Sequence, residues 1–275
     1  MKINNFFFLV IMGLLSCQNN PADSSNEDEG TYNCEITKDQ FQSVDSLVTV
    51  MNDLDPWGSD TVLDSIATLN DSIEKRLTNL LQCGAVETLD ISSETFDNLY
   101  YAQTPDGRIR NFHWYANNGG TWQEMRRIYQ YYPKPKQAKT TTVDYFAGAT
   151  RFFQLKSEEP MYLGMGIDKT CSTCLVEYAD LFSFQADTLK IDNVASLESR
   201  MGDLISFDFD STSQTLHYVM IVDDMNEDWA VDKPKQKFKD LNIELGDEYE
   251  GYEPDPNSDV VMGSLVFNGK AFVEK

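Results

Sequence analysis

The spacing of apolar residues changes near residue 89, and this change constrains the fold of the chain more than any other feature. Before it, apolar residues recur every three to four positions over 37–54 and again over 62–80, which predicts two amphipathic helices. After it, short runs rich in Tyr, Phe, Val, Ile and Thr alternate with turn signals, which predicts strands. The sequence therefore favours an α+β fold that is mainly β.

The two predicted helices should form a hairpin. Thr37 with Gln40 three positions later fits a capping box at the start of the first helix. The Asp-Pro-Trp-Gly run over 55–58 breaks the pattern, and Gly84 suits the end of the second helix. A link this short joins antiparallel helices. Because an isolated helical pair is marginally stable, we expect the hairpin to dock on the strands that follow.

The five cysteines indicate an exported protein with two disulfides. If Cys17 carries a lipid, as argued below, an even number remains for pairing. Antiparallel helices would bring Cys34, before the first helix, beside Cys83, at the end of the second, which leaves Cys171 for Cys174. The Cys-Ser-Thr-Cys run at 171–174 is also compatible with a redox pair or half of a metal site.

The strand-rich part, residues 89–275, should form an antiparallel meander that closes as a sandwich or a barrel-like sheet. Turn signals at short intervals and the absence of intervening helices support this prediction. A long acidic and proline-containing loop is expected over 232–259. Besides the runs that flank the turns near 104–107 and 117–120, the candidate strands are 143–155, 161–168, 174–184, 187–193, 203–210, 214–223, 260–267 and 270–273.

The N-terminal residues 1–16 have the composition of a signal peptide. A basic start and an apolar run of about ten residues precede Leu14-Leu15-Ser16-Cys17, and that run is shorter than the ~20 residues of a membrane span. The last four residues resemble the bacterial lipobox, whose cysteine is lipidated; an ordinary secretory signal is the alternative. Gln18 after the cysteine is similar to the Gram-negative signal for the outer membrane.

Residues 17–33 are polar and acidic, which predicts a flexible tether because the segment has too little apolar surface to offset its ordering entropy. The acidic run at 26–29 resembles a surface-export tag or is plain linker, so the periplasmic and the surface-exposed face both stay open. The folded part then divides into a helical hairpin over 34–88 and a β domain over 89–275.

The net charge of −23 makes the chain a poor partner for nucleic acid, whose phosphates bind Lys and Arg. Against this background, residues 107–143 carry seven basic side chains and one acid, a local charge of +6. If the Asn-Asn-Gly-Gly run at 117–120 is a tight turn, Arg110 lies opposite Arg127. Like charges directly opposite in a sheet are destabilising. This pair therefore needs a counter-charge.

We therefore predict an anion-binding patch on this strand hairpin. Arg side chains bind carboxylate or sulfate with paired hydrogen bonds, and aromatic faces stack on sugar rings, so an acidic glycan or other envelope component would fit. The alternative is that the arginines meet acids of the same molecule. The predicted ligand-binding residues are Arg108, Arg110, Arg126, Arg127, Trp114, Trp122 and Tyr129.

The same register places His113 opposite Glu124, the one acid–base pair that the sequence suggests, with a structural hydrogen bond as the alternative. His217 should be a half-buried packing residue. Two histidines exclude a His-rich zinc site, and the sequence lacks a Gly-x-Ser-x-Gly elbow, although a Ser-His-Asp assembly stays open. We expect no cofactor apart from calcium bound loosely by the acidic segments 223–232 or 247–259.

One segment resembles a known family. Pro105-Asp106-Gly107-Arg108-Ile109-Arg110, then His113-Trp114-Tyr115, then Asn118-Gly119-Gly120-Thr121, is similar to a hairpin that recurs in Bacteroidetes lipoproteins after a helical N-terminal part. The resemblance covers about 30 residues. It implies a cell-envelope lipoprotein and brings no activity and no site residues with it.

The sequence therefore favours a lipid-anchored binding or structural module of the cell envelope, without enzymatic activity. A glycan-processing or other hydrolase that uses His113 and Glu124 is the second hypothesis. An inhibitor or chaperone-like protein that contacts its partner through 232–259 is the third. The membrane, reached through the lipid on Cys17, and an anionic glycan or envelope protein are the expected partners.

Overall fold

A computed structural model describes residues 36–83, 91–119, 124–135, 137–143, 148–172, 174–200, 205–222, 230, 232–241 and 255–275. These residues belong to one compact unit. Helices α1, Lys38–Asn52, and α2, Asp60–Leu81, confirm the two predicted helices. The capping box is also confirmed, because the backbone N–H of Thr37 donates to Oε1 of Gln40 at 2.9 Å. None of the described helices is long and apolar enough to cross a membrane.

The described strands are antiparallel and form three sheets. Two short 3-10 helices, η2 (Ser93–Thr95) and η3 (Phe238–Asp240), precede β1 and follow β11. The first sheet holds β1 (Tyr100–Gln103), β2 (Ile109–Tyr115), β3 (Met125–Tyr131) and β4 (Lys139–Thr142). The second holds β5 (Arg151–Gln154), β6 (Tyr162–Cys171), β7 (Cys174–Gln185) and β8 (Thr188–Arg200). The third holds β9 (Ile205–Asp210), β10 (Thr215–Ile221), β11 (Lys235–Lys237), β12 (Asp259–Phe267) and β13 (Phe272–Glu274).

The first two sheets are meanders in chain order, as predicted, but the strands do not make one closed sheet. The described strands form three open sheets instead of a barrel-like one. The reason is burial on both faces: six of the seven residues of β2 are buried, polar ones included, so neither face of the first sheet is left for solvent. Such a sheet needs a cover on each side.

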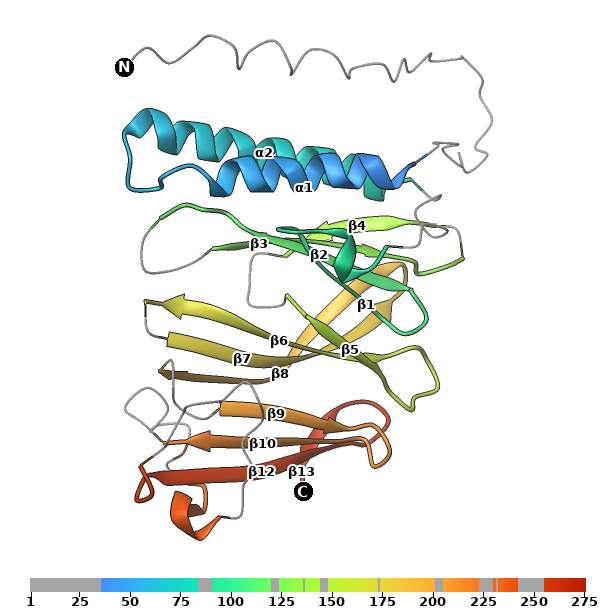
Figure 1. Cartoon of the computed structure of the whole chain (residues 1–275). Coiled ribbons are helices and arrows are strands. Elements are labelled where there is room, and N and C mark those ends of the chain that lie inside the picture. The colour runs from blue at the N-terminus through green and yellow to red at the C-terminus, as the bar shows by residue number, and fades with distance from the viewer. Residues whose placement is uncertain are drawn as a thin grey trace. The chain divides into compact units, whose positions relative to one another are not determined.

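The covers are visible as layers in Figure 1. The antiparallel helices pack on one face of the first sheet, where Phe41 and Leu77 share an apolar core with Phe112 and Trp114. The other face packs on the second sheet, where Tyr129 meets Phe182. The third sheet packs on the far face of the second through a further apolar core. The expected docking of the helical hairpin on the β part is therefore confirmed.

The loop between β2 and β3 is longer than predicted. The backbone N–H of Ala116 bonds to the carbonyl of Glu124 at 2.9 Å, so the turn does not close at 117–120. Asn117, at a φ of 50°, uses its side-chain amide to bond the carbonyls of Met51 (2.7 Å) and Leu54 (3.0 Å) at the end of α1. The loop is therefore shaped by the helical hairpin that it caps, and not by the Asn-Gly turn signal alone.

This loop moves the strand register by three residues. Arg127 lies opposite His113, and Arg110 lies opposite Gln130. The predicted pairing of Arg110 with Arg127 is therefore wrong, and so is that of His113 with Glu124. The two arginines also lie on opposite faces of the sheet, since 110 and 130 share one face and 127 the other.

The predicted disulfides and the predicted acidic loop are each confirmed in part. The Cys171–Cys174 disulfide is confirmed and joins β6 to β7. Cys83 is also disulfide-bonded, but its predicted partner, Cys34, lies outside the described residues. The segment 232–259 is only partly a loop, because Lys235–Lys237 forms β11 and pairs with β12. Its Lys237 is stabilised there by a 2.7 Å ion pair with Asp259.

Candidate anion-binding site

The structure does not bring the predicted ligand-binding residues together in one patch. Arg126 and Trp114 face the helices, whereas Arg127 and Tyr129 lie between the first and second sheets. Arg108 and Arg110 lie at the far end of the hairpin and line a pocket. Trp122 lies outside the described residues.

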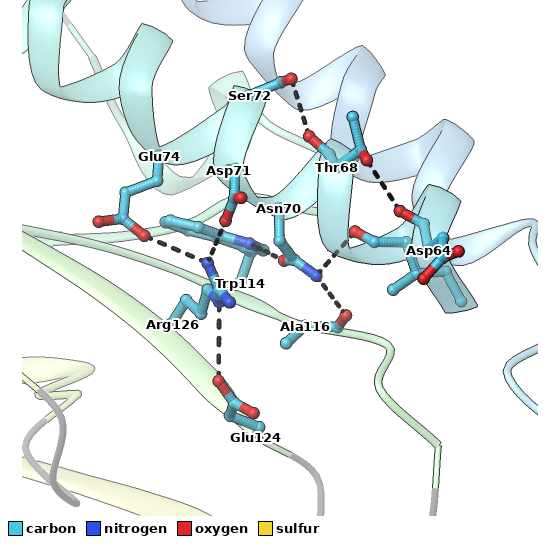
Figure 2. A network of polar contacts seen from close by, with 11 residues as sticks. Asp64, Thr68, Asn70, Asp71, Ser72, Glu74, Trp114, Ala116, Glu124 and Arg126 are labelled. Atoms are coloured by element: carbon cyan, nitrogen blue, oxygen red, sulfur yellow. Dashed lines mark hydrogen bonds and ion pairs between the residues drawn. The ribbon is translucent and has the colours of Figure 1, made fainter. Parts of the chain in front are cut away.

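Arg126 is held by acids of the same molecule. Its Nη1 lies 3.2 Å from Oε2 of Glu74 and 3.4 Å from Oδ1 of Asp71, both on α2, and its Nε lies 3.6 Å from Glu124 (Figure 2). These contacts tie β3 to the second helix. For Arg126 the alternative that arginines meet internal acids is therefore the one observed.

Trp114 is fully buried beneath α2. Its indole Nε1 donates to Oδ1 of Asn70 at 2.9 Å, and Nδ2 of Asn70 donates to the carbonyls of Ala116 (2.7 Å) and Ile66 (3.1 Å) (Figure 2). A side chain with no exposed surface cannot stack on a sugar without unfolding this contact. Trp114 therefore supports the fold and does not line a binding surface.

Arg127 and Tyr129 are also buried, on the opposite face of β3. A guanidinium nitrogen of Arg127, Nη2, donates to Oδ2 of Asp168 on β6. The hydroxyl of Tyr129 accepts the backbone N–H of Ala149 at 3.3 Å. Both residues therefore belong to the contact between the first and second sheets.

The basic pocket, as we call it, remains as the candidate site. It has a volume of about 870 Å³, within the range of small-molecule sites. Its charged lining residues are Arg108, Arg110, Lys134, Asp106 and Glu159. Tyr132 and prolines 133, 135 and 160 add apolar surface. The pocket therefore combines three cations with an aromatic ring in a strongly acidic chain.

The two arginines of the pocket are fixed by their neighbours. Arg108 donates from Nε to the carbonyl of Tyr132 (3.1 Å) and from Nη2 to that of Pro133 (2.7 Å), and its guanidinium lies 4.6 Å above the Phe184 ring. Arg110, which is 5% exposed, donates from Nη1 to Oε1 of Gln130 at 3.4 Å. Side chains held in this way lose little further entropy when a ligand binds.

The acids of the pocket compensate its cations only in part. Asp106 already accepts hydrogen bonds from the Thr104 hydroxyl (2.8 Å) and the Tyr162 hydroxyl (2.5 Å). Burial, together with this bond to Asp106, raises the pKa of Tyr162, so the phenol stays protonated as a donor. Lys134 forms an exposed ion pair with Asp187 at 3.3 Å, which solvent screens and a ligand can replace.

His113 and Glu124 do not form an acid–base pair. His113 is 4% exposed, and burial, with a smaller contribution from Arg127, lowers its pKa to about 3. Glu124 is exposed and bonds to Nδ2 of Asn118 and to Arg126. The hydrolase hypothesis assigned catalysis to this pair, and the structure does not bring the two residues together.

The second histidine lies elsewhere, on the outer face of the third sheet. His217 is exposed and not half-buried as predicted, and its Nδ1 lies 2.8 Å from Oγ of Ser264. Asp208 follows in the same cross-strand row, but no hydrogen bond joins it to His217 among the described residues. The row therefore lacks the carboxylate contact that orients the base of a Ser-His-Asp triad.

The predicted calcium binding concerns two acidic segments that the structure describes only in part. Within the described ranges, no three His, Cys, Asp or Glu side chains are grouped as metal ligands. Most of the acidic segments 223–232 and 247–259 lies outside these ranges.

The sequence pointed to Arg108 and Arg110 but missed the pocket around them. Tyr132 and Lys134 follow β3 directly, and a Tyr-Pro-Lys-Pro run with a local excess of basic residues was the available signal. A comparison with protein-family models, curated proteins and solved structures finds no match to this chain. What the pocket binds must therefore be inferred from its own residues.

Proposed function

We propose that this chain is a lipid-anchored module of the bacterial cell envelope that binds an anionic ligand, such as an acidic glycan, in the basic pocket. The observation that carries the proposal is the gathering of Arg108, Arg110 and Lys134 around one pocket in a chain of net charge −23. The lining holds these three cations against two acids, Asp106 and Glu159, so an anion is favoured here over the rest of an acidic surface.

The chemistry of the lining favours a carboxylate or sulfate on a ring. Guanidinium groups bind such anions with short, charge-assisted hydrogen bonds. The lining prolines, Pro133, Pro135 and Pro160, offer apolar surface for a sugar ring, whereas Tyr132 is buried, with Arg110 5.9 Å from its ring centre. An acidic sugar therefore suits this pocket better than a neutral sugar or a lone phosphate.

The anchoring part of the proposal rests on the sequence. The signal peptide over 1–16, the lipobox that ends at Cys17 and the polar tether over 17–33 are the features of an outer-membrane lipoprotein. Metabolic labelling with an alkyne fatty acid tests it. Wild type should take up the label and Cys17→Ser should not; equal labelling of both would contradict lipidation at this cysteine.

Binding is tested on an array of uronate, sialate, sulfated and neutral glycans. The unlipidated full chain, carrying Cys17→Ser, should be retained by one acidic class, and Lys134→Gln or Arg110→Gln should reduce that retention at least tenfold. Lys134 is exposed, so its replacement leaves folding intact. Arg151→Gln, an exposed arginine on β5, is the matched control. No retention, or equal retention by all variants, would overturn the proposal.

A further inference from the structure

The contact between the first and second sheets has an apolar part and a polar part. The apolar part packs Ile109 and Tyr129 against Tyr162 and Phe182. The polar part is formed by side chains from β2, β3, β6 and β7 that are nearly or fully buried: Asn111, His113, Arg127, Asp168, Tyr178 and Asp180.

Charge in the polar part is not balanced if both carboxyl groups are ionised. Arg127 donates to Asp168, and both of these side chains are more than nine-tenths buried. Arg127 also acts electrostatically on Asp180, so among the described residues one cation serves two carboxyl groups. An uncompensated buried charge costs several kcal/mol, and a carboxyl group in that position gains a proton instead.

Asp180 is the carboxyl group of this contact that forms no ion pair among the described residues. It is 2% exposed, and its Oδ1 accepts a 2.9 Å hydrogen bond from Nδ2 of Asn193 on β8. Its Oδ2 is buried without a hydrogen-bond partner among the described residues, as are the hydroxyl of Tyr178 and Oδ1 of Asn111. A proton on Oδ2 removes the charge of the carboxylate and turns this acceptor into a donor.

We propose that Asp180 binds a proton when the first and second sheets close on each other, and that its ionisation loosens this contact as the pH rises. The stability of the contact between the first sheet, which carries the basic pocket, and the second sheet then depends on pH. Asp180 is the switch because, of the two buried carboxyl groups in this contact, it is the one that forms no ion pair among the described residues.

The groups that face Asp180 set the pH range over which the contact between the two sheets loses stability. Burial raises the pKa of Asp180 to about 7, with Asp168 adding to the rise and Asn193 and Arg127 opposing it. His113 on β2 stays neutral, since its pKa is about 3. The pKa values of Tyr129 on β3 and Tyr178 on β7 are both raised, so these phenols stay protonated. His113 and these tyrosines therefore do not titrate near neutral pH, whereas burial raises the pKa of Asp168 as well, against the charge and hydrogen bond of Arg127.

The sign of the effect follows from the direction of the shift. The folded state binds the proton of Asp180 more tightly than the unfolded state does, so the stabilisation is complete below about pH 4 and is lost as the pH rises towards 7. Asp180→Asn mimics the protonated side chain at every pH. Its unfolding equilibrium constant should be close to that of wild type at pH 4 and smaller by on the order of 1,000-fold at pH 8.

Chemical denaturation of the unlipidated full chain at pH 4 to 8 measures this difference, and hydrogen exchange locates it. Protection of β3 and β7 amides, corrected for intrinsic rates, should fall with pH in wild type but not in Asp180→Asn. Asp192→Asn is the matched control, because Asp192 on the neighbouring strand is about half exposed and paired with Lys190. A constant difference between Asp180→Asn and wild type at all pH values would overturn the proposal.

A direct titration keeps the test independent of variant folding. Carboxyl carbon NMR of the wild-type chain should show one aspartate with a midpoint between pH 6 and 8, and its signal should be absent from Asp180→Asn. Asp168→Asn should shift this midpoint downwards, because Arg127 would then be available to Asp180. Titration midpoints near pH 4 for every aspartate of the wild-type chain would contradict the proposal.

Discussion

At the scale of single residues, Asn70 is the polar link between α2 and the first sheet. One side chain satisfies the buried indole N–H of Trp114 and the buried carbonyl of Ala116 (Figure 2). Asn70→Ala should lower the free energy of unfolding by about 3 kcal/mol, because two buried polar groups lose their partner. Urea denaturation measures this loss. Asn79→Ala, an exposed asparagine on the same helix, should cost less than about 0.5 kcal/mol; equal costs would contradict this role.

His113 should make the protein sensitive to acid. Its folded-state pKa of about 3 lies below the unfolded value, so its contribution to stability is complete above about pH 6.5 and is lost as the pH falls towards 3. Relative to wild type, His113→Gln should gain roughly 2 kcal/mol between pH 7 and 4.5. Denaturation curves at both pH values measure the gain. No change with pH, or the same change in His217→Gln, whose histidine is exposed, would argue against it.

The residues that matter most inside the molecule were the hardest to recognise from sequence. Asp168 and Asp180 stand in apolar strands, where a charged residue usually faces solvent. A single sequence carries no local signal that another sheet covers these two aspartates. By contrast, Arg108 and Arg110 were recognisable because a local basic excess stands out in an acidic chain.

At the scale of elements, Asp45 fastens α1 to the segment that leads into β1. Its carboxylate accepts the backbone N–H groups of Asp97 (3.0 Å), Asn98 (2.9 Å) and Leu99 (2.7 Å). Asp45→Asn should cost about 2 kcal/mol, because an amide has one acceptor oxygen and presents donors to the other N–H groups. Thermal denaturation checks this cost. Asp39→Asn, exposed on the same helix, should leave the melting temperature nearly unchanged, and similar losses in both would refute the role of Asp45.

The helices could be predicted from sequence, whereas the register of β2 and β3 could not. An apolar stripe over several turns is a local signal, and capping residues mark its start. The register depends on Asn117, whose side chain bonds carbonyls more than 60 positions away. A turn signal read in isolation therefore gave a hairpin that was three residues out of register.

At the scale of the whole molecule, antiparallel strands and a docked helical hairpin were predictable, but the division into three sheets was not. The strand β2 reads Ile-Arg-Asn-Phe-His-Trp-Tyr, which mixes polar and apolar residues as a half-exposed strand does. Its polar residues are buried because neighbouring segments cover them: Asn111 donates to the carbonyl of Ala149, just before β5, and Arg110 donates to Gln130 on β3. Such partners are a property of the assembled layers.

The layers also explain why a single pocket is the best candidate for function. Of the four arginines on the predicted hairpin, Arg126 and Arg127 hold neighbouring layers together. Arg108 and Arg110 remain at the end of the first sheet, beside Lys134. Loss of the first pair should therefore reduce stability, and loss of the second pair should reduce binding.

The most direct test of the central claim compares one ligand with and without its charge. Calorimetric titration of the unlipidated full chain with the acidic glycan that the array identifies gives a dissociation constant. The same glycan after carboxyl reduction, or after desulfation, differs in the anion alone. Affinity for the neutral form should be at least tenfold lower, and Lys134→Gln should lose most of this discrimination. Equal affinity for the two forms would contradict an anion-binding pocket.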